Sequence, residues 1–254
     1  MKSLANFTRQ DCQSVRLLAT DFDGTVTEKG QLTPSAIQAF SKLQEIGIAV
    51  VIVTGRSAGW VNGLRHYLPV AGAIAENGGV YYSEPDVSSD LLVSLPSLTE
   101  HRQNLYQVFQ RLQIAFPDLQ EATDNPFRFT DWTFEVAGLS EADLRQLQND
   151  CQQQGYSFTY SSVQCHIKPQ NQDKATGLKT VLSKYFPELT PAEVLTIGDS
   201  PNDQSLFNPQ LFPLSVGVAN IQDYPQQLQY SPQYITQAAE GKGFCELVNY
   251  LISH

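Results

Sequence analysis

The sequence has few cysteines for its length. Cys12, Cys151, Cys165 and Cys245 are scattered over 254 residues, and no two of them form a C-x-x-C pair. This spacing provides neither a disulfide framework nor a zinc motif. We therefore expect reduced, structural thiols and a protein of a reducing compartment, the cytoplasm.

Basic residues are also scarce, with 16 lysines and arginines against 26 acidic residues and a formal charge of -10. This balance disfavours binding to nucleic acid or to anionic membranes, so neither is expected as a partner. It does not exclude a small anionic substrate, because a bound metal ion reverses the local field. No protein partner is evident from the sequence.

Long apolar runs are absent as well. The longest, residues 46–53, is far too short to span a bilayer. The first fourteen residues lack the apolar core of a signal peptide, which again favours the cytoplasm. The 41% of hydrophobic residues is nevertheless ample for a core and argues against disorder.

The most informative stretch follows an apolar run at 15–19 that predicts a short buried strand. It reads Asp21-Phe22-Asp23-Gly24-Thr25. Side chains two apart on an extended backbone point the same way, so Asp21 and Asp23 can face one spot at the carboxyl end of the strand. In open α/β sheets, ligands bind at that end.

Two carboxylates this close repel each other unless a cation lies between them or one is protonated. Mg²⁺ suits the first solution because it prefers oxygen ligands. A carboxylate is also a nucleophile in enzymes that form an aspartyl phosphate. The alternative for Asp21 and Asp23 taken alone is an acidic turn that caps a strand.

Strand and helix signals alternate in the two outer parts of the chain. Apolar runs at 48–53, 71–75, 193–197 and 212–218 predict further strands, and helices are expected at 33–46, 57–67, 173–186 and 243–252. The first of these helices is expected to bury Ile37, Phe40, Leu43 and Ile46. This alternation predicts a doubly wound, Rossmann-like α/β domain with a parallel sheet, formed by 1–82 and 170–254.

The middle, 83–169, has a different rhythm and predicts a separate α+β cap inserted into that domain. Its expected elements are helices at 98–116 and 140–154 and strands at 128–136, 157–160 and 163–168, with loop and irregular strand at 85–96. Trp132 and Phe134 are expected in the core of the cap.

Polar signatures also follow other predicted core strands. Thr54 and Gly55 offer a hydroxyl and free backbone N–H groups for a phosphate, and Asp199, Asn202 and Asp203 follow a later strand. Alone, Thr54 is an ordinary strand residue and Asn202-Asp203 a helix cap. Lys174, which begins the helix after the insertion, is alone a solvated charge. Together these residues supply what phosphoryl transfer needs.

These motifs resemble those of the haloacid dehalogenase superfamily of phosphohydrolases. The matching segments are Asp21-Phe22-Asp23-Gly24-Thr25, Val53-Thr54-Gly55-Arg56, Asp173-Lys174 and Gly198-Asp199-Ser200-Pro201-Asn202-Asp203. The position of the insertion, and Glu76-Asn77-Gly78-Gly79 before it, resemble the type IIB cap group, which includes Cof-like and sucrose-phosphate phosphatases.

The resemblance implies a Mg²⁺-dependent phosphomonoester hydrolase acting on a small phosphorylated metabolite, such as a sugar phosphate. Asp21 would be the nucleophile and Asp23 the general acid and base. Asp21, the backbone carbonyl of Asp23 and Asp199 would hold Mg²⁺, with Asp203 behind them. The phosphate would contact the residues Thr54, Gly55, Lys174 and Asn202.

Substrate contacts in or near the cap are less defined. The candidates are Arg56, Asn77, Arg128, His166 and Lys168. The alternatives are that Arg56 pairs with an acid and that the His166–Lys168 strand shows its polar face to solvent. Two other functions stay open: a phosphomutase of the phosphomannomutase type, and a non-catalytic sugar-phosphate sensor.

Overall fold

The computed structural model describes residues 1–83 and 89–253. Its α-helices are α1 (Arg9–Ser14), α2 (Pro34–Glu45), α3 (Ala58–Leu64), α4 (Leu98–Ala115), α5 (Glu141–Gln153), α6 (Lys174–Tyr185) and α7 (Glu240–Ser253). Its strands are β1 (Lys2–Ser3), β2 (Leu17–Thr20), β3 (Ala49–Val53), β4 (Gly72–Ala75), β5 (Val80–Tyr82), β6 (Asp90–Leu91), β7 (Trp132–Glu135), β8 (Tyr156–Tyr160), β9 (Gln164–Pro169), β10 (Val194–Gly198), β11 (Leu214–Gly217) and β12 (Tyr234–Ile235). Short 3-10 helices are η1 (Leu4–Asn6), η2 (Asn125–Phe127), η3 (Pro191–Glu193), η4 (Pro201–Phe207) and η5 (Ala219–Asp223).

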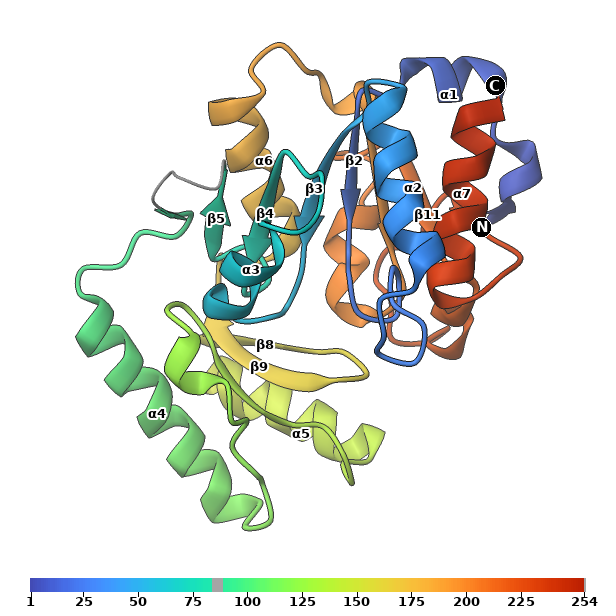
Figure 1. Cartoon of the computed structure of the whole chain (residues 1–254). Helices are drawn as coiled ribbons and strands as arrows, with labels where there is room; N and C mark the ends of the chain where they lie inside the picture. Colours follow the sequence, from blue (N-terminus) through green and yellow to red (C-terminus); the bar gives the residue numbers. More distant parts are fainter. Residues whose placement is uncertain (84–88, 254) are drawn as a thin grey trace.

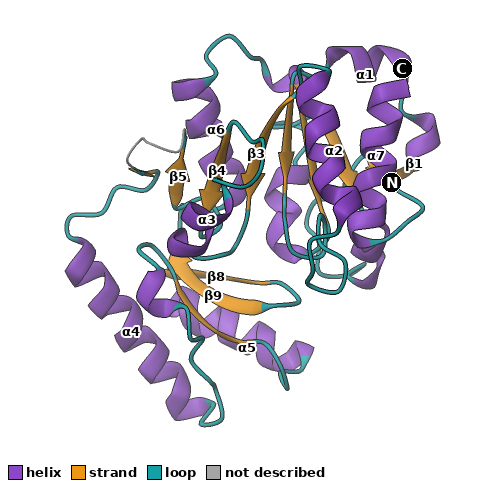
Figure 2. Ribbon diagram, in the orientation of Figure 1, coloured by secondary structure: helices purple, strands orange, loops and turns teal. Residues whose placement is uncertain are grey.

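The larger sheet has nine strands in the order β1-β12-β11-β10-β2-β3-β4-β5-β6 (Figures 1 and 2). Every pair from β1 to β4 is parallel, and β5 and β6 continue the sheet antiparallel. Helices cover both faces: α1, α2, α3 and α7 pack on one side, and α6 with η4 packs on the other. The predicted doubly wound α/β fold is confirmed.

The apolar runs of β2 and β3 explain why these strands lie at the centre. Their side chains alternate between the two faces, so Leu18 and Val50 join the core under α2 and α7. Leu17 and Val51 join the core under α6. A strand buried on both faces must be apolar throughout, as these are.

Helix α2 begins as the sequence predicts, with the Thr33 side chain accepting a hydrogen bond from the Ala36 amide and Pro34 in the first turn. Its buried face differs from the expectation. Ala36, Ala39, Phe40 and Leu43 are buried, whereas Ile37 and Ile46 are each 44% exposed. The two small alanines let this face of α2 lie close to the sheet. Ile37 and Ile46 lie outside this buried face.

A second sheet of three antiparallel strands, in the order β7-β9-β8, lies below the carboxyl ends of β2 and β3 (Figure 1). Helices α4 and α5 cover its far face. Phe134, Cys165 and Ile167 point into this second core, together with Leu105 and Leu147 from the helices. The opposite face of the sheet carries polar side chains toward the larger domain.

The structure corrects two details of the predicted insertion. Strand β6 pairs with β5, so part of the segment assigned to the cap extends the larger sheet. The strand expected at 128–136 spans only Trp132–Glu135, because the amides of Phe129 and Thr130 bond to Glu76 rather than to a strand. Residues 84–88, within the expected irregular segment, lie outside the described residues.

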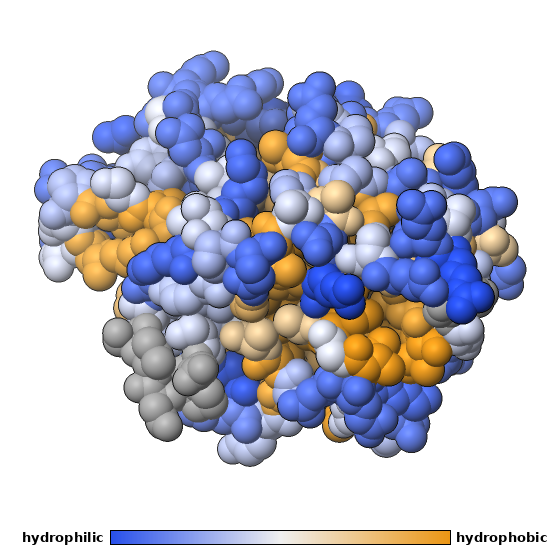
Figure 3. Space-filling view, turned by 90° about the horizontal axis from the view of Figure 1, so that it is seen from above, coloured by the Kyte–Doolittle hydropathy of each residue, from blue (hydrophilic) through white to orange (hydrophobic). Residues whose placement is uncertain are grey.

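The surface seen from above is mainly hydrophilic, with apolar side chains in separate patches (Figure 3). The four cysteines are free, as expected, and Cys12, Cys151 and Cys165 are buried. Among the described helices, none is long and apolar enough to cross a membrane.

Candidate active site

The site lies where the central strands end and the cap begins. Asp21 follows β2 directly and is 4% exposed. The chain then turns at Gly24, whose φ is +78°. A Cβ at Gly24 would lie 2.5 Å from Asp199 Oδ2, so this position needs glycine for both its backbone angle and its close contact.

Lys174 is fully buried in the first turn of α6 and joins two carboxylates. Its Nζ donates to Asp21 Oδ1 at 2.5 Å and to Asp203 Oδ1 at 2.6 Å. Although burial opposes its charge, Asp203 and Asp21 raise the pKa of Lys174. The second oxygen of Asp203 accepts the Asp199 and Ser200 amides, which fixes the turn after β10.

Three carboxylates meet around this lysine. One oxygen each of Asp21, Asp199 and Asp203 lies within 4.8 Å of the others. Burial raises the pKa of Asp199 well above its usual range, and Asp21 and Asp203 raise it further. Burial and Asp203 likewise raise the pKa of Asp21 to about 7, against the opposing charge of Lys174. One ammonium does not neutralise three buried carboxylates, so the donor set fits a hard divalent cation such as Mg²⁺.

Two residues to which the sequence analysis assigned no role hold Asp199 in place: Thr25, within the first motif, and Asn220, which was missed. Thr25 Oγ1 donates to Asp199 Oδ1 at 3.2 Å, and Asn220 Nδ2 donates to Asp199 Oδ2 at 3.0 Å. Asn220 also donates to the Gly24 carbonyl. A signal for Asn220 was present: it lies three residues after β11, the parallel neighbour of β10, and so at the same edge of the sheet.

The predicted phosphate-binding residues lie on neighbouring loops. Thr54 follows β3 and is 1% exposed; its Oγ1 accepts the Arg56 amide at 3.1 Å. Asn202 Nδ2 donates to Asn77 Oδ1 at 3.2 Å. Asn77 Nδ2 is buried without a hydrogen-bond partner among the described residues. Thr54 and Gly55 on one loop and Asn202 on another line the same small pocket as Asp21.

Arg56 pairs with the second aspartate of the motif. Its Nε donates to Asp23 Oδ2 at 2.8 Å and its Nη2 to Asp23 Oδ1 at 2.7 Å. The guanidinium also lies over the Trp60 ring, 5.3 Å from its centroid. Both oxygens of Asp23 are occupied, so Arg56 must release at least one before Asp23 can pass a proton to a leaving group.

A small pocket lies between the motif loops and the cap. It is lined by Asp21, Asp23, Thr54, Gly55, Arg56, Ser161, Val163, Gln164, His166, Ser200 and Asn202. Its volume of about 20 Å³ is room for roughly one water molecule. The cap has to move away for a phosphate ester to enter.

The candidate cap residues divide into two groups. His166 lines the pocket, so its strand does not show its polar face to solvent. Arg128 and Lys168 do not line it: Arg128 lies in the loop before β7, not on a strand, and its side chain is fully buried. Lys168 donates to Ser157 Oγ at 3.1 Å and to the Gln172 carbonyl, and burial lowers its pKa to about 8.

Comparison with known protein families gives a match over most of the chain. Residues 14–251 match the family described as sucrose-6F-phosphate phosphohydrolase. The chain belongs to this family. The resemblance to the haloacid dehalogenase superfamily is thereby confirmed, and the chain is a phosphatase of that type.

The curated relatives are similar over almost their whole length. Phosphoglycolate phosphatase 1 of Saccharolobus solfataricus is 29% identical over 243 residues, which cover 94% of this chain and 96% of the relative. A phosphoglycolate phosphatase of Methanothrix thermoacetophila is 26% identical over 249 residues, covering 93% and 97%.

Solved structures support the fold. A Thermoplasma acidophilum protein superimposes with a TM-score of 0.74 at 20% identity, covering 93% of this chain and 98% of that one. The haloalkanoate-superfamily phosphatase BT1666 of Bacteroides thetaiotaomicron gives 0.67 at 19% identity, covering 93% and 95%. Such phosphatases share the larger parallel sheet described above.

Proposed function

We propose that this family member is a Mg²⁺-dependent phosphomonoester hydrolase acting on a small phosphorylated metabolite, a sugar phosphate, through an aspartyl phosphate on Asp21. The observation that carries the proposal is the position of Asp21. It is buried at the end of β2, bonded to Lys174 at 2.5 Å and grouped with two further carboxylates.

The nucleophile is Asp21. A carboxylate attacking a phosphate ester must overcome repulsion between two anions, and the ammonium of Lys174 offsets that repulsion at the reacting oxygen. Lys174 is kept charged by Asp203, so it does not become a proton donor at neutral pH. Asp21 takes the phosphoryl group as the bond to the leaving oxygen breaks.

Asp23 serves both half-reactions. Released from Arg56 and protonated, it gives its proton to the leaving oxygen, and as a carboxylate it then takes a proton from the water that hydrolyses the aspartyl phosphate. The same pocket contains both Asp21 and Asp23. Closing the cap excludes other water from this step.

Mg²⁺ would be held by Asp21, the backbone carbonyl of Asp23 and Asp199, with Asp203 orienting Lys174 behind them. When bound, it neutralises charge on the transferring phosphoryl group. Thr54, Gly55, Lys174 and Asn202 would hold the phosphate oxygens. The unpaired Asn77 amide, adjacent to Asn202, is suited to order this group.

The proposed mechanism gives each of the two domains its own role. We assign 1–82 and 170–254, together with the short β6, to the catalytic domain, and the remainder of 83–169 to a substrate-selecting cap. Arg56, Asn77 and His166 lie near the boundary, where the leaving group would sit. Arg128 and Lys168 would affect the leaving group only indirectly, through the residues that they contact.

The test is phosphate release by the purified protein from a panel of phosphorylated sugars, glycerates, nucleotides and phosphoglycolate, with and without Mg²⁺. Asp21→Asn is the control for contaminating phosphatases. Release that needs both Mg²⁺ and Asp21 supports the proposal. Release that persists in Asp21→Asn contradicts it, and activity only with a bisphosphate primer would favour a mutase instead.

A further inference from the structure

His166 is a cap side chain that lies against the phosphate-binding loop. On β9, Cys165 and Ile167 point into the cap core, whereas His166 points to the catalytic domain and is 2% exposed. A Cβ on Gly55 would lie 3.2 Å from His166 Nε2, so the absence of a side chain at Gly55 lets the imidazole approach the loop.

Asp131 determines which ring nitrogen carries the proton. His166 Nδ1 lies 2.8 Å from Asp131 Oδ2. Burial alone would raise the pKa of Asp131, but Arg128 and His166 outweigh it and lower that pKa, so Asp131 is a carboxylate that only accepts. Nδ1 therefore donates, and because burial lowers the pKa of His166, Nε2 carries a lone pair at neutral pH.

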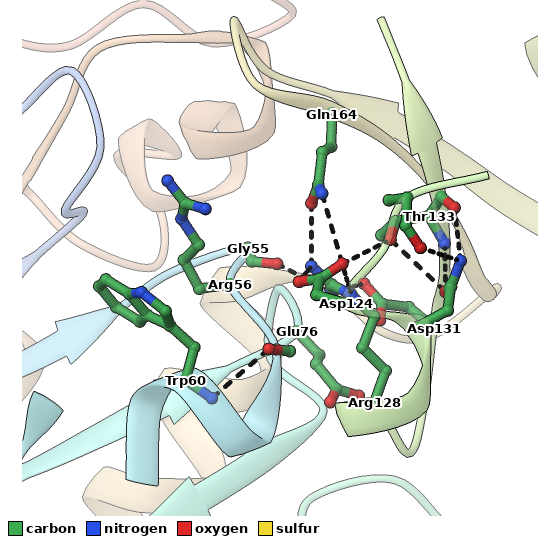
Figure 4. A network of polar contacts seen from close by, with 12 residues as sticks. Gly55, Arg56, Trp60, Glu76, Asp124, Arg128, Asp131, Thr133 and Gln164 are labelled. Carbon is green, nitrogen blue, oxygen red and sulfur yellow. Dashed lines mark hydrogen bonds and ion pairs between the residues drawn. The ribbon is translucent and has the colours of Figure 1, made fainter. Parts of the chain in front are cut away.

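Arg128 holds this arrangement rigid (Figure 4). Its Nη1 donates to the Gly55 carbonyl at 3.0 Å and to Asp131 at 2.9 Å. Its Nη2 and Nε donate to Asp124 at 2.8 and 3.2 Å, and Nη2 also reaches Gln164 Oε1. With its nitrogens occupied within the protein, Arg128 is a positioning residue that fixes Asp131 and the phosphate-binding loop together.

His166 Nε2 is thus an acceptor in the pocket, and no donor among the described residues forms a hydrogen bond with it. The other polar groups facing the same space include the carboxylates Asp21 and Asp23 and the guanidinium of Arg56, which is bonded to Asp23. A buried acceptor is costly unless a donor meets it. A hydroxyl of the leaving group satisfies this need, whereas a carboxylate has no proton to offer.

We propose that His166 is the specificity-determining residue of the cap and accepts a hydrogen bond from a hydroxyl of the leaving group. This inference rests on the proposed phosphatase function and narrows its substrates. They are polyol or sugar phosphates rather than phosphorylated acids without a hydroxyl, such as phosphoglycolate. Asp131 and Arg128 hold His166 in the tautomer whose Nε2 can accept this hydrogen bond.

The test compares kcat/KM for glycerol 3-phosphate and propyl phosphate, which differ only in two hydroxyls, in the Mg²⁺-loaded protein. We expect the hydroxylated ester to be preferred by roughly 10- to 100-fold, the effect of an unpaired buried acceptor. His166→Ala should bring the ratio close to one. His166→Gln, whose amide oxygen also accepts, should restore part of it, and exposed His66→Gln should leave it unchanged.

A second measurement is independent of turnover. The ¹⁵N chemical shifts of His166 should show an unprotonated Nε2 and a protonated Nδ1, and Asp131→Asn should allow the other tautomer and reduce the substrate ratio.

Three results would overturn the inference while leaving the phosphatase function intact. They are a protonated Nε2 in the wild-type chain, a ratio that His166→Ala does not change, and a preference for phosphoglycolate over glycerol 3-phosphate. If no ester releases phosphate in a Mg²⁺- and Asp21-dependent way, the phosphatase proposal fails and this inference fails with it.

Discussion

The catalytic edge and the cap network both bury several charges, but they balance them differently. At the edge of the larger sheet, Asp21, Asp199 and Asp203 share one lysine, and burial raises the pKa of Asp21 and Asp199. In the cap, Arg128 pairs with Asp124 and Asp131, and both carboxyl pKa values are lowered. An uncompensated cluster is ready to take a cation, whereas a compensated one serves as a scaffold.

The largest expected effect comes from removing the nucleophile at the uncompensated edge. Asp21→Asn should lower kcat by about four orders of magnitude or more, since the amide cannot form the acyl phosphate. The assay is Mg²⁺-dependent phosphate release. Asp118→Asn, on the exposed surface of the cap, is the matched control and should retain wild-type activity.

Asp23→Asn should have the next largest effect, and it depends on the leaving group. With an alkyl phosphate we expect kcat to fall about 10²- to 10⁴-fold, because the poor leaving group needs a proton. The first step with p-nitrophenyl phosphate should lose much less. Equal losses for both esters in single-turnover experiments would mean that Asp23 is not the acid.

In the cap, the comparison predicts a loss of stability. Arg128→Met should lower the free energy of unfolding by about 3–5 kcal/mol, because the buried carboxylate of Asp131 loses the guanidinium that neutralises it and keeps only the hydrogen bond from His166. Urea denaturation measures the change. Arg145→Met, which removes an exposed ion pair with Glu141, should cost at most about 1 kcal/mol. Similar losses for the two variants would show that the network is not a compensated scaffold.

The smallest expected effect is a pH dependence of the stabilisation by Mg²⁺ at the catalytic edge. Mg²⁺ at 100 times its Kd stabilises a protein by about 2.7 kcal/mol. Protons compete for Asp21, whose metal-free pKa is raised to about 7, and for Asp199. At a fixed Mg²⁺ concentration, the rise in Tm should therefore be larger at pH 8 than at pH 6. A rise independent of pH would place the cation elsewhere.

Much of the catalytic edge could be predicted because its geometry follows from strand order alone. Asp21, Thr54 and Asp199 each follow a buried strand, and parallel strands bring their carboxyl ends together. Lys174 alone would have been interpreted as a solvated charge, and it became a candidate only together with the other motif residues. Side chains on a strand alternate between its two faces, so the direction in which they point can be predicted without knowing which distant residues they contact.

The cap could not be predicted to the same depth because its polar residues depend on distant contacts. Arg128 meets Gly55 across 73 positions and His166 meets Asp131 across 35. Glu76 accepts from Thr130 across 54 positions and so replaces the strand expected there by a loop. No local sequence pattern shows that the guanidinium of Arg128 donates its hydrogen bonds to other residues of the protein. Arg128 was therefore predicted to contact the substrate.

The central claim is covalent chemistry at Asp21, and trapping the phosphoenzyme tests it most directly. The Asp23→Asn variant would be mixed with Mg²⁺ and p-nitrophenyl phosphate, quenched in acid and digested for mass spectrometry. The account predicts a phosphoryl group on the peptide that contains Asp21, absent without Mg²⁺. Two results would contradict it. In one, the variant releases phosphate at the wild-type rate while no phosphoryl group is found on Asp21 at any time. In the other, the phosphoryl group is found on a different residue.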